Sequence, residues 1–172
     1  MQERVFGIET EYAIIWHPRG KTTARPTNLE IYRRIEAALL GRVRSLPQIF
    51  SLRAKGGRFL ENGGSFHYEA GPAQFESGLL ELASPECRDP DTLLAHERAK
   101  DELAEELAAE VTRELERAGW RGEVRLGKNN VDSAGHTFGS HESYWVEDPL
   151  AKAALALFLP VWLALWVISA PV

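Results

Sequence analysis

Cysteine is almost absent from this sequence, because Cys87 is the single one among 172 residues. One thiol cannot form an internal disulfide, so a disulfide-stapled secreted scaffold is excluded and a reducing, cytoplasmic location is expected. An excess of positive charge is also missing, since 20 lysines and arginines stand against 25 acids and give a formal net charge of −5. A nucleic-acid-binding protein normally presents a basic face, so we expect no nucleic-acid partner.

The sequence has no internal repeat, no low-complexity tract and no linker. No signal peptide is expected either, because residues 1–4 lead directly into mixed polar sequence. Hydrophobic residues make up 44% and charged residues 26% of the chain, a balance typical of globular proteins. A chain of this length can bury a sizeable core, and we therefore expect one globular domain.

The final 20 residues, 153–172, contain no charged side chain. A run of that length could span a bilayer, and it could equally be a core helix that further polypeptide covers. Pro160 would kink a membrane helix, and Trp162 and Trp166 lie inside the run rather than at its ends. We therefore favour a buried element whose cover comes from other polypeptide, and we expect no membrane partner.

Hydrophobic periodicity, helix caps and turn residues predict an α+β domain with a mainly antiparallel sheet. Strands are expected at Arg4–Trp16, Ser65–Ala70, Leu79–Ala83, Glu123–Asn129 and Glu142–Val146. One helix is expected to have Asn28 as its N-cap and to run to about Arg44. A longer helix is expected to open at residues 89–91 and to end at Gly119, and the glycine-rich segment 53–64 predicts a loop or turn.

Two carboxylates stand close together on the first predicted strand. Glu9 and Glu11 are two residues apart, so both side chains leave the same face, with Cα atoms roughly 7 Å apart. Carboxylates in this arrangement can share one or two Mg²⁺ ions, which prefer oxygen ligands and keep substrate phosphates in their remaining positions. The competing interpretation is a solvated strand face that happens to carry two acids.

Further polar side chains fall on the next predicted strands. His67 and Glu69 share one face of the strand 65–70, and Glu81 stands in the strand 79–83. Residues that converge from several strands on one surface favour a site, although His67 alone could be a structural histidine and Glu81 a surface charge. The segment 128–144 adds Asn130, which suits a turn, and the polar pair His141 and Glu142, which is unusual at the start of a strand. A metal–phosphate site nearby would account for that pair.

Four segments resemble, in order, the motifs of the Pup ligase and Pup deamidase family, whose enzymes attach or remove a small bacterial tagging protein. They are Gly7–Tyr12, Leu60–Gly64, Leu80–Cys87 and, taken together, Lys128–Asn130 with Gly139–Glu142. The resemblance implies a fold similar to glutamine synthetase, in which a curved, mainly antiparallel sheet backed by helices cradles Mg²⁺ and ATP. Residues 1–172 would be the N-terminal part of that catalytic domain, because family members are two to three times longer. The chain would then be a fragment, half of a split enzyme or a degenerate product.

The resemblance also implies roles for the residues singled out above. Glu9, Glu11 and Glu81 would hold Mg²⁺, and the nucleotide would be bound by Glu9, Glu11, His67, Asn130, His141 and Glu142. ATP would phosphorylate the side chain of the C-terminal glutamate of Pup, and a lysine of a target protein would displace the phosphate to form an isopeptide bond. Glu69 stands where the family has a catalytic aspartate, and His67 stands where it has a tyrosine, which indicates a divergent branch.

The direction of the reaction stays open. Residues 7–10 and 132–135 are more similar to the ligase, whereas residues 130–132 and 140–141 are more similar to the deamidase, which also cuts Pup from its targets. The span from Glu9 to Asn62 is too short for the long insertion usual in the deamidase, so we favour the ligase. Two other readings remain: a ligase of the same superfamily that joins small molecules, and a non-catalytic truncated interaction module.

Overall fold

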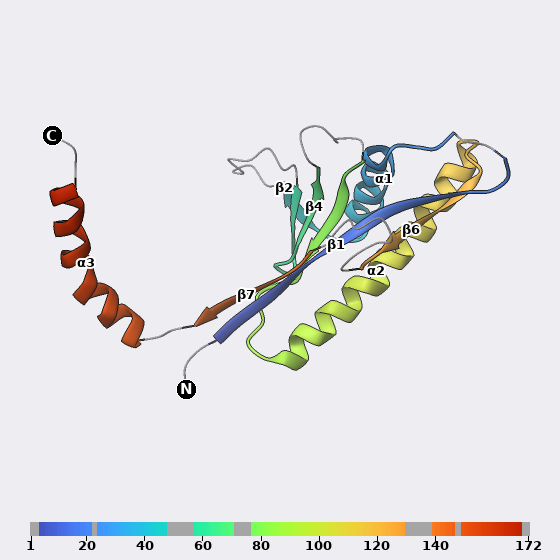
Figure 1. Cartoon of the computed structure of the whole chain (residues 1–172). Helices are drawn as coiled ribbons and strands as arrows, with labels where there is room; N and C mark the ends of the chain where they lie inside the picture. The colour runs from blue at the N-terminus through green and yellow to red at the C-terminus, as the bar shows by residue number, and fades with distance from the viewer. Residues whose placement is uncertain are drawn as a thin grey trace.

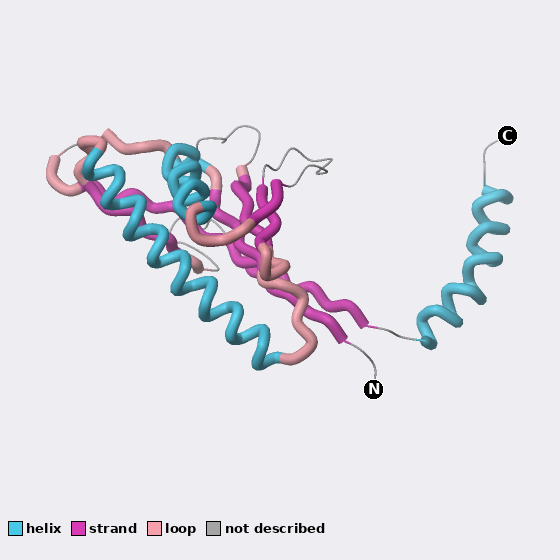
Figure 2. The backbone as a smooth tube through the Cα atoms, turned by 180° about the vertical axis from the view of Figure 1, so that it is seen from behind, coloured by secondary structure: helices cyan, strands magenta, loops and turns pink. Residues whose placement is uncertain are grey.

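The computed structural model describes residues 4–21, 24–47, 57–70, 77–129, 139–146 and 149–169. Seven strands form one sheet in the order β2-β3-β4-β5-β1-β6, and β7 also pairs with β1. Every pairing between the described strands is antiparallel. The helices α1 and α2 lie on one side of this sheet (Figures 1 and 2). The expected α+β class with a mainly antiparallel sheet backed by helices is confirmed.

The strand β1 (Arg4–Pro18) is the axis of the sheet because it pairs with three other strands. Along one edge it pairs with β5 (Leu79–Ala83), and along the other with β7 (Ser140–Val146) and then β6 (Gly122–Gly127). The side chains of β1 alternate as a half-buried strand requires: Tyr12, Ile14 and Trp16 are buried, and the residues between them are more exposed. The predicted strand is confirmed and ends two residues later than expected.

The remaining strands extend the sheet beyond β5. They are β4 (Ser65–Glu69), β3 (Gly57–Leu60) and β2 (Ser45–Pro47). The expectation of a loop over 53–64 was wrong for Gly57–Leu60, which pairs with both β2 and β4; residues 53–56 lie outside the described part. The turn itself is where it was expected, because Gly63 has φ of 88° and the Asn62 side chain accepts a hydrogen bond from the Gly64 amide at 2.9 Å.

The helix α1 (Asn28–Leu40) begins and ends earlier than predicted. Its N-cap is Thr27, whose hydroxyl accepts a hydrogen bond from the Glu30 amide at 3.1 Å, so the assignment of Asn28 was wrong. The Asn28 side chain instead donates to the Gly78 carbonyl at 2.9 Å. The helix stops before Gly41, because the chain turns there to enter β2, and it does not reach Arg44.

The helix α2 (Pro90–Arg117) confirms its predicted signals. Asp89 caps it by accepting from the Thr92 amide at 2.8 Å, and Gly119 follows its end with φ of 92°. The core lies between the helices and the sheet. Among the described residues it contains seventeen buried side chains, which include Ile31, Ile35, Leu39, Phe66, Leu80, Leu107, Val111 and Leu115. This packing leaves the opposite face of the sheet uncovered by α1 and α2.

The apolar C-terminal run forms the helix α3 (Pro149–Ser169), which stands apart from the sheet (Figure 1). Its large apolar side chains from Leu155 to Leu163 are exposed, with Leu157 at 73% and Trp162 at 62% of full exposure. The expected cover is therefore not supplied by the described residues of this chain. Within that same described part, no helix combines the length and apolar character that crossing a membrane requires.

Candidate functional site

The candidate site begins with a row of polar side chains that crosses three adjacent strands. Glu11 of β1 is the register partner of Glu81 of β5, and Glu81 is the register partner of His67 of β4. Directly opposed residues of antiparallel strands project from the same face of a sheet. The three side chains therefore stand side by side on the face away from α1 and α2, as the alternation of buried residues along β1 requires.

Glu69 joins this row from the same strand as His67. One carboxylate oxygen each of Glu11, Glu69 and Glu81 lies within 4.8 Å of the others. Glu81 is only 8% exposed, and the other two are half-buried. Three carboxylates at such distances repel one another strongly unless a cation lies between them. An all-oxygen donor set of this charge fits Mg²⁺ or Mn²⁺.

Glu9 lies one rung away from this group and faces a different partner. Its register partners are Ala83 on β5 and His141 on β7, and its carboxylate lies 3.6 Å from the His141 Nδ1 atom. The His141 side chain is 66% exposed and that of Glu9 is 45% exposed, so the pair by itself contributes little to stability. The structure thus brings Glu11, Glu81 and Glu69 together and leaves Glu9 and His141 at the rim of the same face. Their assignment to a metal or nucleotide stays a prediction.

Gly139 orients Glu11 and was not singled out as a site residue by the sequence. Its amide donates a hydrogen bond to the Glu11 carboxylate, and its carbonyl accepts one from the Glu11 amide at 3.1 Å. A Cβ atom at this position would lie 3.1 Å from Glu11 Oε1 and 3.0 Å from His141 Nε2, which is tighter than ordinary contact. A glycine directly before a strand that carries His141 is the signal that could have identified it.

Gly57 on β3 makes room for His67. The two residues are register partners, and a Cβ atom at position 57 would come within 2.2 Å of the His67 Nδ1 atom. His67 is 8% exposed, and its register partners are Gly57 on β3 and Glu81 on β5, so its imidazole is held between these two strands. The close approach of backbone and ring is possible only because position 57 has no side chain.

One of the predicted nucleotide-binding residues, Glu142, is not brought to this face. Glu142 is the register partner of Ile8, which places it on the opposite side of the sheet from Glu9 and Glu11. There its carboxylate accepts a hydrogen bond from the Tyr144 hydroxyl, which raises the pKa of that tyrosine. Asn130 lies outside the described residues.

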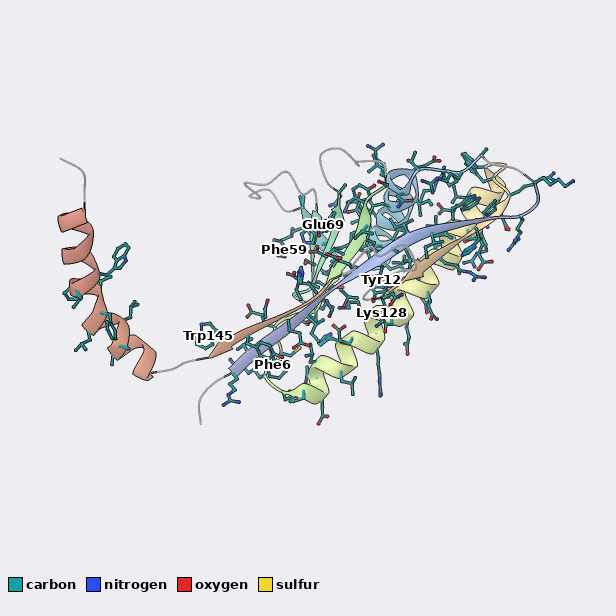
Figure 3. The ribbon with its side chains drawn as sticks, viewed as in Figure 1. Phe6, Tyr12, Phe59, Glu69, Lys128 and Trp145 are labelled. Carbon is teal, nitrogen blue, oxygen red and sulfur yellow. The ribbon has the colours of Figure 1, made fainter. Side chains whose placement is uncertain are left out.

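In the segment Gly7–Tyr12 of β1, the even-numbered residues face the helices, and α2 contacts them there. The Tyr12 hydroxyl donates to Asp101 at 2.6 Å, and the Lys128 ammonium donates to the same carboxylate at 2.6 and 2.8 Å. Burial by itself raises the pKa of Asp101, but the hydrogen bonds from Lys128 and Tyr12 outweigh it and lower that pKa. In Figure 3, Tyr12 and Lys128 lie toward α2, whereas Glu69 lies with Phe59 on the strands beyond β1.

Comparison with known proteins identifies relatives of this chain. Residues 4–164 match the family model described as Pup-ligase protein. The Pup–protein ligase of Kineococcus radiotolerans is 34% identical over 146 residues, which are 85% of this chain and 28% of the relative. The Pup–protein ligase of Acidimicrobium ferrooxidans is also 34% identical, over 144 residues that make 84% of this chain and 28% of the relative.

A solved structure shows the same similarity in three dimensions. The crystal structure of the complex between prokaryotic ubiquitin-like protein Pup and its ligase PafA superposes with a TM-score of 0.63 at 31% identity. The superposition covers 89% of this chain and 27% of that chain. This chain therefore spans little more than a quarter of the length of the relatives that it matches.

Proposed function

The chain belongs to the Pup-ligase family, and we propose from this premise that it forms the metal- and nucleotide-binding part of an ATP-dependent Pup–protein ligase. The observation that carries the proposal is the convergence of Glu11, Glu69 and Glu81 on one face of the sheet. Such a group has little use in a structural surface because its charges repel. It has a direct use where Mg²⁺ and nucleotide phosphates are bound.

Glu11 and Glu81 are the residues that would hold Mg²⁺ in this proposal, with Glu9 one rung away; Glu69 lies beside them and has a separate role in the reaction. Bound Mg²⁺ would neutralise charge on the phosphates of ATP. Glu81 is the most deeply buried of these acids, so its carboxylate would bind the side of the ion that faces the protein. Gly139 and Gly57 keep Glu11 and His67 in place, which preserves the geometry that phosphoryl transfer depends on.

The reaction that we propose has two steps. The side-chain carboxylate of the C-terminal glutamate of Pup attacks the γ-phosphorus of ATP, the bond to the leaving ADP oxygen breaks, and an acyl phosphate forms. A target lysine amine then attacks the acyl carbon, the new C–N bond forms as the C–O bond to phosphate breaks, and inorganic phosphate leaves. Glu69 accepts the proton that the lysine loses, as general base.

The partial length of the chain bears on how this activity is completed. Because the chain spans about a quarter of its relatives, we propose that further polypeptide, for example a second chain, supplies the rest of the catalytic domain. The exposed apolar side chains of α3 support this, since soluble proteins rarely leave such a surface uncovered. The relatives and the solved neighbour reported above are named as ligases, which favours the ligase over the deamidase direction.

The first test is native mass spectrometry of the protein isolated from its source cells. A co-purifying chain would identify the species on which transfer of Pup to a lysine substrate should be measured with Mg²⁺ and ATP. Isopeptide formation that stops when Glu11 and Glu81 are changed to glutamine supports the proposal. Release of ammonia from Pup that ends in glutamine, without transfer to lysine, would favour the deamidase instead. Absence of any divalent-cation binding would reject both.

A further inference from the structure

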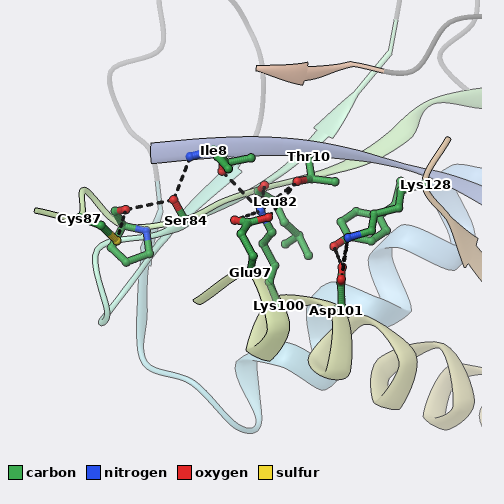
Figure 4. A network of polar contacts seen from close by, with 11 residues as sticks. Ile8, Thr10, Leu82, Ser84, Cys87, Glu97, Lys100, Asp101 and Lys128 are labelled. Atoms are coloured by element: carbon green, nitrogen blue, oxygen red, sulfur yellow. Dashed lines mark hydrogen bonds and ion pairs between the residues drawn. The ribbon is translucent and has the colours of Figure 1, made fainter. Parts of the chain in front are cut away.

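One buried amine, which the proposed chemistry does not use, lies on the opposite side of the sheet from Glu11, Glu69 and Glu81, here called the acidic group. Lys100 of α2 is 9% exposed, and its ammonium nitrogen lies within hydrogen-bonding distance of four oxygen atoms (Figure 4). These acceptors are Glu97 Oε1 at 2.7 Å, Thr10 Oγ1 at 3.0 Å, the Leu82 carbonyl at 3.2 Å and the Ile8 carbonyl at 3.4 Å. A helix side chain thus reaches into the sheet instead of into solvent.

The strand acceptors of Lys100 belong to two neighbouring strands at one place. Thr10 of β1 and Leu82 of β5 are register partners, and Lys100 bonds to both. Their neighbours along the chain point to the opposite face, because side chains alternate along a strand. Those neighbours include Glu11 and Glu81, two members of the acidic group. Lys100 therefore holds β1 and β5 together at the rung next to the one from which these acids project.

Lys100, Glu97 and Thr10 each contact the other two and form a triangle of polar contacts. Glu97 accepts from Lys100 through Oε1, and its Oε2 atom lies 3.4 Å from the Thr10 hydroxyl, which in turn accepts from Lys100. Burial lowers the pKa of Lys100, and the hydrogen bond and charge of Glu97 partly offset this. A buried ion pair of this kind adds little net stability, since desolvation of both charges opposes their attraction. The pair therefore contributes mainly a fixed geometry.

We propose that Lys100 is a positioning residue for the metal-binding carboxylates: by tying Thr10 to Leu82 from behind the sheet, it sets the spacing of Glu11 and Glu81 for a divalent cation. Its positive charge also lowers the mutual repulsion of these acids through the thin, water-poor layer of the sheet. This inference rests on the proposed metal-binding function and assigns to α2 a direct part in it.

The test compares Mn²⁺ binding to the full chain with and without the pair. The variant carries Lys100→Met together with Glu97→Gln, so that no unpaired buried charge remains. The control carries Arg42→Met with Glu110→Gln, which removes the contacts that Arg42, just after α1, makes with Glu110 and Glu106 of α2. Mn²⁺ affinity and site symmetry are measured by electron paramagnetic resonance, and the fold is checked by circular dichroism and thermal unfolding.

We expect the Lys100 variant to keep its fold and to bind Mn²⁺ at least about tenfold more weakly, the lower end of the effect of residues that orient metal ligands. The control should bind as the unaltered chain does. Equal Mn²⁺ affinity and an unchanged spectrum in the folded Lys100 variant would overturn the inference while leaving the proposed function intact. If the unaltered chain binds no Mn²⁺, the proposed function fails first and this inference with it.

If the double variant does not fold, a second variant tests the positioning role of Lys100. Thr10→Val keeps the shape of the side chain and removes only the hydroxyl that accepts from Lys100. It should weaken Mn²⁺ binding in the same direction, by about threefold or more, with a similar melting temperature, because one of the four contacts is lost. Unaltered Mn²⁺ affinity in folded Thr10→Val would then reject the positioning role.

Discussion

Glu11 and Glu81 oppose each other directly in the ladder between β1 and β5, although they are far apart in the chain. Like charges in this relationship destabilise a sheet, and Glu81 is largely buried as well. The relationship is therefore costly for folding and is of use only when a cation is held between the carboxylates.

The first prediction concerns the change Glu81→Gln. In the metal-free chain it should raise the melting temperature, because it removes repulsion with Glu11 and Glu69. In the presence of Mn²⁺ it should weaken binding by at least about tenfold, since a ligand charge is lost. Thermal unfolding with and without Mn²⁺ measures both effects. Glu123→Gln, which removes a carboxylate paired with Arg125 on β6, should change neither; a lower metal-free melting temperature in Glu81→Gln would contradict the idea.

The second prediction separates the base from the metal ligands. In the assembly that we propose transfers Pup to lysine, Glu69→Ala should lower the rate of transfer by at least about 10², the usual contribution of a general base. Binding of Mg²⁺ and ATP should persist, because Glu11 and Glu81 remain. Single-turnover transfer and nucleotide binding, measured on the same preparation, distinguish the two roles. Transfer at the original rate would remove Glu69 from the mechanism.

The third prediction concerns Gly57. The change Gly57→Ala places a methyl group where the His67 ring lies, since the Cβ atom would be 2.2 Å from Nδ1. We expect the free energy of unfolding to fall by about 1–3 kcal/mol, as for overpacking elsewhere, and the His67 imidazole to shift in the NMR spectrum. Gly41→Ala is the matched control, because its Cβ would make ordinary contact at 3.4 Å and its φ is −72°.

The fourth prediction concerns stability in acid. The pKa of Asp101 is lower in the folded state, although burial opposes this, because Lys128 and Tyr12 donate hydrogen bonds to its carboxylate. Its stabilising contribution should therefore be complete above the unfolded pKa of about 3.9 and should be lost as the pH falls through the lower folded value. Chemical unfolding followed from about pH 7 down to about pH 3 should show a shallower loss of stability for Asp101→Asn. An identical pH profile would contradict the assignment.

The fifth prediction concerns the exposed helix α3. Its uncovered apolar side chains should make the isolated chain self-associate, since soluble monomers rarely expose so large a patch. Changing Leu159 and Trp162 together to glutamate should increase the monomer fraction in size-exclusion chromatography with light scattering. Leu94→Glu alters a single exposed leucine on α2 and should have no such effect. A monomeric unaltered chain would show that α3 is covered in solution.

Local rules were sufficient for several parts of the fold. The strand β1, the capped helix α2 and the turn at Gly63 were predicted because alternation, N-caps and positive-φ glycines depend only on residues a few positions apart. Two predictions made from local signals failed. Thr27 displaced Asn28 as the cap of α1, and β3 formed in a segment whose glycines predicted a loop, because β2 and β4 supply its hydrogen bonds.

By itself the sequence determined that Glu9 and Glu11 lie on the same face of one strand and that His67 and Glu69 lie on the same face of another. It also determined which family the motifs resemble. Only the tertiary structure decided which of these faces meet. Register pairs Glu11 with Glu81 and brings Glu69 into the same group, while it places Glu142 on the other side of the sheet and Lys100 beneath the acids. The physical reason is that alternation is a property of one strand, whereas register is fixed by hydrogen bonds and packing between strands that are distant in the chain.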